Sequence, residues 1–377
     1  MSGRLVLITG GAGFIGANLA HRLAASGQPV LIYDNLSRPG VDRNLAWLRR
    51  THGDAVTVEI ADIRDSAALR AAVQRAGQVF HLAAQVAVTT SLADPLHDFA
   101  VNAGGTLNLL EAVRGCAVPP PVVFTSTNKV YGAVDDLDLE PGATRYMPRA
   151  EDGRGSGIDE TRPLDFHSPY GCSKGTADQY VVDYARSYGL PALVFRMSCI
   201  YGPHQFGTED QGWVAHFLLR AIAGEPITIY GDGRQVRDIL FVEDLVDAFL
   251  LAQEKMPRLR GQAFNIGGGA RNTASLVELV DRIALLHRRR PEVIHGAWRT
   301  GDQRYYVSDH GKFSRAAGWQ PLVSAAEGVA RLYHWLAEQR QAEARPAVAA
   351  RQRAVAGRNA TQPAARAEAL PRVSVPT

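Results

Sequence analysis

The chain has 377 residues, of which 46% are hydrophobic, 21% charged and 8% aromatic, and it contains 36 glycines and 20 prolines. This composition excludes a wholly disordered, a collagen-like or a disulfide-scaffold protein. The length suffices for a sizeable core in one large α/β unit or in two or three domains. The net charge of +3 is unevenly placed: residues 340–377 hold seven arginines and two glutamates, a net +5, which leaves −2 for residues 1–339. A mildly acidic body argues against nucleic acid as its partner.

The cysteine count and the hydropathy pattern indicate in which cellular compartment the protein is located. Cys116, Cys172 and Cys199 form no CxxC pair, so we expect neither a disulfide framework nor a bound metal. No apolar run approaches the roughly 18 residues that cross a membrane, and the chain enters a strand-like run at 4–9 without a signal-peptide pattern. We therefore expect a cytoplasmic protein without a membrane partner.

Short apolar runs alternate with longer amphipathic segments through the first half of the chain. The intervals suit βαβ units, in which helices cover both faces of a parallel sheet. The sequence therefore predicts an α/β fold with a doubly wound, Rossmann-type parallel sheet and a smaller α/β C-terminal lobe. The predicted strands cover 4–9, 30–33, 56–60, 78–82, 121–126 and 192–195, and the predicted helices cover about 14–26, 65–76, 96–114 and 170–187.

A glycine-rich turn, GGAGFIG at 10–16, follows the first predicted strand. Such glycines permit a tight turn, close approach of a pyrophosphate, and contact between helix and strand, so that phosphate oxygens meet the N–H groups at the helix start. Asp34 ends the second strand 18 residues after Gly16, where a carboxylate binds the ribose hydroxyls and repels a 2′-phosphate. These features predict NAD as cofactor, with NADP, bound through Arg38, as the alternative. The predicted cofactor-binding residues are Gly10, Gly13, Phe14, Ile15, Gly16, Asp34, Asn35, Asp62, Ile63, Ala83, Ala84, Gln85, Asn102, Tyr170 and Lys174.

Three residues form the predicted catalytic set. Tyr170 and Lys174 are four apart at the start of a predicted helix and so share one face. A nearby ammonium stabilises a phenolate, so we expect Lys174 to lower the pKa of Tyr170 from about 10 toward neutrality. Tyr170 can then accept an alcohol proton while a hydride passes to the nicotinamide. Thr127, where the fifth strand ends, can hydrogen-bond the reacting oxygen.

These motifs resemble the extended short-chain dehydrogenase/reductase family of sugar-nucleotide epimerases and dehydratases, over about residues 4–338. Runs at 196–203, 229–238, 264–267 and 301–304 agree with it. The resemblance implies that the C-terminal part binds a nucleotide diphosphate sugar, with Arg237 on the diphosphate, and that the protein is a homodimer or homotetramer. Cys199 stands where many relatives have asparagine. The remaining implied substrate-binding residues are Asn128, Cys199, Arg299, Arg304 and Tyr306.

Two runs, STNKVYG at 126–132 and LDFHSPYGCSK at 164–174, are similar to those of CDP-sugar 2-epimerases within that family. In the 4,6-dehydratases an Asp and a Glu follow the catalytic Thr and carry out water elimination, whereas this chain has Asn128 and Lys129. The resemblance therefore implies epimerisation by transient oxidation at C2 of a CDP-linked dideoxyhexose to a 2-keto intermediate, with Tyr170 exchanging the proton. A UDP- or CDP-hexose 4-epimerase is the alternative in the family, and a non-catalytic dinucleotide sensor with a nucleic-acid-binding tail is a more distant one.

The predicted domain division has three parts. Residues 1–200 form the NAD-binding Rossmann domain, which includes an insertion or lid at about 133–165. Residues 201–339 form the sugar-nucleotide-binding lobe, with some strands returning to the first domain. Residues 340–377 contain twelve alanines, four prolines and no aromatic residue, so we expect a disordered tail.

Overall fold

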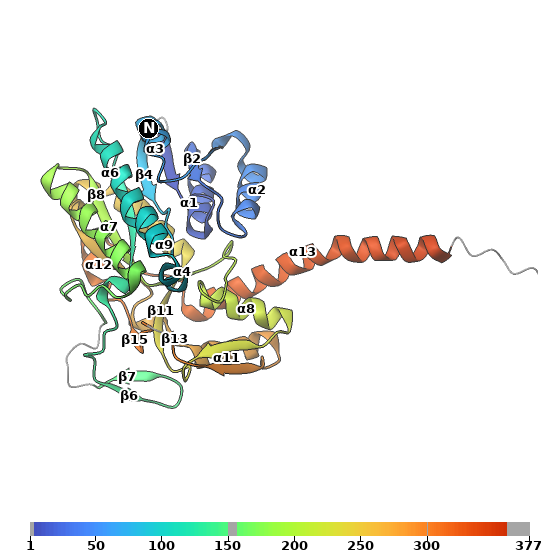
Figure 1. The fold of residues 1–377 in the computed structure, drawn as a ribbon. Coiled ribbons are helices and arrows are strands. Elements are labelled where there is room, and N and C mark those ends of the chain that lie inside the picture. The colour runs from blue at the N-terminus through green and yellow to red at the C-terminus, as the bar shows by residue number, and fades with distance from the viewer. Residues whose placement is uncertain (1–3, 150–156, 300, 360–377) are drawn as a thin grey trace, which may run out of the picture.

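A seven-stranded, fully parallel sheet forms the centre of the fold, in the order β12-β8-β5-β4-β1-β2-β3 (Figure 1). The fold is given by a computed structural model that describes residues 4–149, 157–299 and 301–359. The chain starts in the middle of the sheet and winds outward in both directions, so the predicted doubly wound α/β fold is confirmed. The strands are β1 (Leu5–Thr9), β2 (Val30–Asp34), β3 (Val56–Ile60), β4 (Ala76–His81), β5 (Val122–Thr127), β8 (Ala192–Met197) and β12 (Ala263–Ile266).

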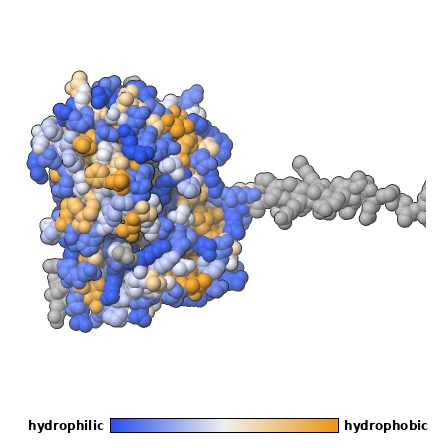
Figure 2. All heavy atoms as spheres, in the orientation of Figure 1, coloured by the Kyte–Doolittle hydropathy of each residue, from blue (hydrophilic) through white to orange (hydrophobic). Residues whose placement is uncertain are grey.

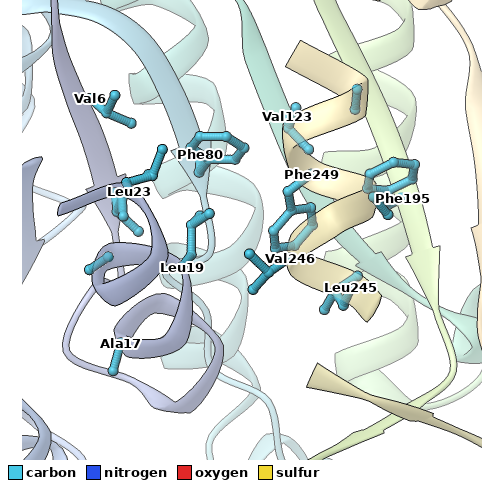
Figure 3. Packing of buried hydrophobic residues seen from close by; sticks show 14 of the residues in the cluster. Val6, Ala17, Leu19, Leu23, Phe80, Val123, Phe195, Leu245, Val246 and Phe249 are labelled. Carbon is cyan, nitrogen blue, oxygen red and sulfur yellow. The ribbon is translucent and has the colours of Figure 1, made fainter. Parts of the chain in front are cut away.

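Helices cover both faces of this sheet because successive strand residues point to opposite sides. In β1, Leu7 belongs to the core that includes residues of α3, α6 and α7, whereas Val6 and Ile8 belong to the core that includes residues of α1, α2, α9 and α12. Figure 3 shows this second core, where Leu19 of α1 and Phe249 of α9 pack under the strands. The helices of this part are α1 (Phe14–Ala25), α2 (Val41–His52), α3 (Ser66–Arg75), α4 (Val88–Ala93), α5 (Pro95–Phe99), α6 (Gly105–Arg114), α7 (Ser168–Ser187), α9 (Val242–Glu254), α10 (Met256–Leu259) and α12 (Gly311–Ala317).

The smaller lobe has its own core and two small sheets. Strand β11 pairs with β9, β13 and β15, and β10 pairs with β14. Side chains such as Leu218, Ile239, Ile283 and Leu332 form the core between these sheets and three helices. The strands are β9 (Cys199–Tyr201), β10 (Ile227–Tyr230), β11 (Val236–Phe241), β13 (Thr273–Ser275), β14 (Val293–Gly296) and β15 (Tyr305–Tyr306), and the helices are α8 (Trp213–Ala223), α11 (Leu276–His287) and α13 (Ala325–Asn359).

Short elements complete the fold. Within the predicted insertion at 133–165 the structure has a two-stranded hairpin, while residues 150–156 lie outside the described part of the chain. The hairpin strands are β6 (Leu139–Pro141) and β7 (Tyr146–Pro148), and the short turns are η1 (Gly53–Ala55), the π-helical η2 (Ala100–Gly104), η3 (Asn128–Tyr131) and η5 (Ala270–Asn272). Among the described residues, no helix has the length and apolarity that crossing a membrane requires.

The second half of the chain is interwoven with the first. Strand β12 extends the central sheet beside β8, and α9 and α12 pack on its face, so residues after 201 help to build the predicted cofactor domain. Helix α13 continues to Asn359 and extends away from the body (Figure 1), and the expected division of the chain with a disordered tail from residue 340 stays a prediction. Alanine and arginine are strong helix formers, which accounts for the helix in 340–359. The rest of the predicted tail, 360–377, lies outside the described residues. Figure 2 shows that the apolar residues on the face in view form separate patches among hydrophilic ones.

Candidate active site

The glycine turn joins β1 to α1 at the sheet edge where ligands bind in doubly wound folds. Gly10 has a φ of +70°, and a Cβ at this position would lie 2.7 Å from the Ala83 backbone nitrogen. A Cβ at Gly16 would lie 2.4 Å from the Gly10 carbonyl oxygen. Helix α1 begins at Phe14 after Gly13, and no described side chain caps it, so its first N–H groups remain available to phosphate. This geometry fits a dinucleotide pyrophosphate.

Asp34 is fixed next to this turn. One carboxylate oxygen accepts a hydrogen bond from the Ala12 N–H at 3.0 Å and the other from the Leu36 N–H at 2.9 Å. Burial raises the pKa of Asp34, and these backbone donors oppose that effect. Arg38, the residue of the NADP alternative, donates to the Gln211 side chain. The arrangement leaves Asp34 as the candidate ribose ligand.

Asp62 follows β3 beside the next turn. Its carboxylate accepts hydrogen bonds from Asn35 at 2.9 Å and from the Arg64 guanidinium at 2.8 Å, and the Arg64 bonds hold the pKa of Asp62 well below its usual range. Ile63 is buried, and a Cβ on Gly105 would lie 2.6 Å from it. Asn35 and Asp62 therefore sit together at the same end of the sheet as Asp34.

The loop after β4 is held by a buried asparagine. The Asn102 side chain accepts from the Gln85 N–H at 3.0 Å and donates to the Gln85 carbonyl at 3.0 Å. It also lies 3.0 Å from the Ser173 hydroxyl of α7. At its start the loop is fixed by the Ala83 N–H, which donates to the Thr9 hydroxyl at 3.3 Å. These contacts engage the Asn102 amide with protein groups and position the loop, and its predicted contact with the cofactor stays a prediction.

Tyr170 and Lys174 lie on the first turns of α7 and are buried, with 9% and 3% of their surfaces exposed. The Lys174 ammonium donates to the Thr125 carbonyl at 2.6 Å and lies 4.3 Å from the Phe124 ring centre. Thr127, at the end of β5, hydrogen-bonds the Tyr170 phenol. The structure thus brings the three predicted catalytic residues together.

The expected effect of Lys174 on Tyr170 is wrong for the chain by itself. Burial raises the pKa of Tyr170 to about 12, which outweighs the lowering by the Thr127 hydrogen bond and by Arg38. Burial also lowers the pKa of Lys174 to about 7, against the carboxylates of Asp178 and Asp98. Both groups lose water on folding, and burial disfavours the charged form of each. The phenol is therefore protonated at neutral pH.

Asp98 is a buried residue near the site that the sequence reasoning missed. It is 0% exposed, and one carboxylate oxygen accepts from Gln85 at 3.0 Å and from Asn102 at 3.1 Å. Its charge acts on both Lys174 and Tyr170. The available signal was its position one helical turn before Asn102, which places both side chains on one face.

A second group of predicted residues meets at segment 301–303. The Arg237 guanidinium donates to Asp302 at 2.6 Å and to the Gln303 carbonyl at 2.5 Å. The Asn128 amide donates to the Gln303 side chain at 3.3 Å. Cys199, in β9, lies close enough for the charge of Arg237 to act on its thiol, whose pKa burial raises. Asn128, next to Thr127, and Arg237 thus both contact segment 302–303, with Cys199 near Arg237, and their role in binding substrate stays a prediction.

The other three predicted substrate residues lie elsewhere. Arg299 donates to the Glu209 carbonyl at 3.1 Å. Arg304 lies over the rings of Tyr146 and Trp298, at 5.7 and 5.8 Å from their centres. Tyr306 is fully buried in a core cluster, and its assignment as a substrate contact stays a prediction. Its place in β15 turns the side chain into that core, which the local sequence did not reveal.

The described residues hold no group of three or more His, Cys, Asp or Glu that could hold a metal ion, and the three cysteines are free thiols. The uncapped start of α1, the two glycines with no room for a Cβ, and Asp34 together form a site with the shape and donors that NAD requires.

Comparisons with known proteins agree with this site. Residues 6–267 match the NAD dependent epimerase/dehydratase family. The chain is 44% identical over 337 residues to the CDP-paratose 2-epimerase of Salmonella typhi, covering 88% of this chain and 98% of that protein. It is 34% identical over 325 residues to the UDP-glucose 4-epimerase of Mycolicibacterium smegmatis, covering 86% and 96%. The solved UDP-glucose 4-epimerase of Thermus thermophilus in complex with NAD is 32% identical, with a TM-score of 0.72 and coverage of 88% and 98%. The chain belongs to the NAD-dependent epimerase/dehydratase family.

Proposed function

We propose that this protein is an NAD-dependent nucleotide-sugar epimerase that inverts C2 of CDP-paratose to give CDP-tyvelose. The observation that carries the proposal is the sequence at the end of β5, where Thr127 beside the Tyr170 phenol is followed by Asn128 and Lys129. A 4,6-dehydratase of this family needs an Asp and a Glu there for elimination. An epimerase needs only the Thr, Tyr and Lys set, and the 44% identity to the CDP-paratose 2-epimerase supports the choice of substrate.

In the proposed mechanism the Thr127 hydroxyl holds the C2 oxygen while the Tyr170 phenolic oxygen accepts its proton. Bound NAD supplies the hydride acceptor at C2 and later the donor. The Thr127 hydrogen bond and the charge of Arg38 lower the pKa of Tyr170 against the effect of its burial, and so favour the phenolate that accepts the proton. The resulting 2-keto sugar rotates within the site. Tyr170 then returns the proton to the C2 oxygen as the hydride returns to the opposite face of C2. Because proton and hydride both return, no external reductant is consumed.

A 4-epimerase acting on a UDP- or CDP-hexose is the second candidate, favoured by the identity of 32–34% to UDP-glucose 4-epimerases. The same Thr127, Tyr170 and Lys174 could serve that reaction at C4. Incubating the purified protein with CDP-paratose, CDP-glucose and UDP-glucose, and following inversion by NMR, separates the two. Inversion of CDP-paratose at C2 is expected, and inversion only at C4 would reject the proposal. Absorbance and mass measurements on the cofactor released from denatured protein should identify NAD and not NADP.

We further propose a cytoplasmic homo-oligomer, a dimer or a tetramer. The three free thiols support a reducing compartment. Large apolar side chains are exposed on α5 and on α7, which packs beside it: Leu96 at 83% and Phe99 at 57% in α5, and Tyr180 at 41% in α7. Exposed apolar residues on adjacent elements are typical of protein–protein contacts. Light scattering should give at least twice the monomer mass of 40.8 kDa, and Leu96→Glu should shift the protein toward monomer.

A further inference from the structure

Two cations converge beside the catalytic threonine. Lys129 lies in η3, and its backbone N–H donates to the Thr127 hydroxyl at 3.2 Å. Its ammonium donates to the Gly301 carbonyl at 3.1 Å. The next residue of that segment, Asp302, pairs with Arg237 at 2.6 Å. Gly301 and Asp302 therefore contact both Lys129, which lies two residues after Thr127, and Arg237, the residue predicted to bind the diphosphate.

The two cations act on one another, and the carboxylate of Asp302 offsets part of their repulsion. Burial and the positive charge of Arg237 together lower the pKa of Lys129 to about 8, against the opposing effects of Asp302 and Cys199. Arg237 already donates to Asp302 and to the carbonyls of Gln303 and Val236. An ammonium has three donors, and among the described residues the Gly301 carbonyl is the acceptor recorded for Lys129. Lys129 thus has donors left for a ligand, as does Arg237, whose five N–H groups make three of these bonds.

The bonding in a nucleotide diphosphate sugar determines which of its anionic groups would lie near Lys129. In a nucleotide diphosphate sugar the phosphate is attached through oxygen to C1, so its phosphorus lies three bonds from C2 but five bonds from C4. When the C2 hydroxyl occupies the place between Thr127 and Tyr170, the sugar-linked phosphate must therefore lie close to the same residues. A C4 hydroxyl in that place would hold the phosphate farther away.

We propose that Lys129 binds the sugar-linked phosphate and thereby presents C2, and not C4, to Thr127 and Tyr170. This inference rests on the proposed function as a 2-epimerase and adds a specificity-determining residue to it. Charge-assisted hydrogen bonds to phosphate contribute about 1.5–3 kcal/mol each, so one lost contact corresponds to roughly a tenfold or larger loss of affinity.

The test is calorimetric binding of CDP and of CMP to the full-length, NAD-loaded protein. CDP carries a second phosphate in place of the sugar-linked one, and CMP lacks it. Lys129→Gln should weaken CDP binding about tenfold or more and change CMP binding much less, whereas Lys129→Arg should retain CDP affinity. The matched control is Lys255→Gln, because the Lys255 ammonium also donates to a backbone carbonyl, that of Ala317 at 2.6 Å, away from the site.

The pH dependence gives a second readout. Since only the charged ammonium attracts phosphate, CDP affinity of the wild type should be full below pH 8 and fall above it as Lys129 loses its proton, with Arg237, Asp302 and Cys199 as the neighbouring charges. Lys129→Arg should bind CDP equally on both sides of pH 8. Retained NAD content shows that each variant is folded.

Unchanged CDP affinity in Lys129→Gln, or equal weakening of CDP and CMP, would overturn the assignment of Lys129. A failure of the proposed function looks different, because the wild type would then leave CDP-paratose unconverted in the NMR assay. If the wild type inverts C2 while Lys129→Gln binds CDP normally, the function stands and this inference falls.

Discussion

Tyr170 is the residue whose chemistry the proposed reaction needs most directly. Replacing it with phenylalanine removes the phenolic oxygen and keeps the ring that packs in the site. Because proton transfer by a positioned group contributes about 10²–10⁴-fold, Tyr170→Phe should lower kcat by at least a hundredfold. The bound NAD should remain, since the glycine turn and Asp34 are untouched. Turnover by NMR and cofactor content by absorbance test this, and a near wild-type rate would show that another group moves the proton.

Asp98 shows how a buried charge can act on a site without touching the substrate. Its carboxylate raises the pKa of Lys174, with Ser173 and His97 as further neighbours. Asp98→Asn should therefore lower the pKa of Lys174, so that the ammonium loses its proton at a lower pH. We expect the alkaline limb of the plot of kcat/KM against pH to shift to lower pH by about one unit. Asp94→Asn, an N-cap exchange on the same helix, is the control and should leave the profile in place.

A buried ion pair holds α7 against the sheet. The Arg196 guanidinium donates to both carboxylate oxygens of Asp178 at 2.9 Å, and Asp178 is 0% exposed. Arg196→Met would leave that carboxylate buried without its partner, which costs about 3–5 kcal/mol. Urea unfolding measures this loss. The exposed pair Arg22–Asp247, at 2.5 Å, provides the comparison: Arg22→Met should cost less than about 1 kcal/mol, and equal losses would contradict the argument.

At the scale of elements, the turn between β1 and α1 tolerates no added carbon atom. A Cβ at Gly16 would lie 2.4 Å from the Gly10 carbonyl oxygen, so Gly16→Ala must displace the turn. We expect about 1–3 kcal/mol of destabilisation and loss of bound NAD. Gly104→Ala is the control, because that glycine is helical and its Cβ would lie 3.8 Å from the nearest atom. The Gly104→Ala variant should have the same thermal stability as the wild type or a slightly higher one, and it should retain NAD.

Local spacing predicted the elements that build the cofactor site, because the glycine turn, the strand ends and the Tyr170–Lys174 interval are set by neighbours in sequence. Helix α2 was not predicted, since its buried stripe of Val41, Leu45 and Leu48 is narrow among charged residues. The place of β12 beside β8 depends on a pairing between distant segments, which no local pattern encodes. The Lys129–Arg237 pair was missed for the same reason.

At the scale of the molecule, an aromatic cluster joins the two lobes. We define the interlobe cluster as His21 of α1, Trp47 of α2, His204 of the loop after β9, and Trp335 of α13. The His204 and Trp47 rings stack at 3.7 Å, and Trp335 lies 4.9 Å from His204. Asn44 ties the same loop to the glycine turn, donating to the carbonyls of Ala12 and His204 at 3.2 Å. The cluster therefore connects α13 to the cofactor site.

This cluster should make the contact between the lobes sensitive to acid. Burial, with a smaller effect from the charge of His21, lowers the pKa of His204 to about 4. The unfolded chain takes up the proton near pH 6.5, so His204 contributes stability that is complete above pH 6.5 and is lost as the pH falls toward 4. We expect this loss to be about 2 kcal/mol after allowance for partial exposure.

Urea unfolding at pH 7 and pH 4.5 measures the effect in the wild type and in His204→Asn. Asparagine tolerates the φ of +68° at this position, so the variant should fold, with lower stability at pH 7 because it loses the stack on Trp47. Its stability should nevertheless fall less between the two pH values than that of the wild type. His334→Asn, on the exposed side of α13, should keep the wild-type dependence. If His204→Asn loses as much stability in acid as the wild type, the acid sensitivity resides outside the interlobe cluster, and the two lobes are joined by contacts that protonation does not affect.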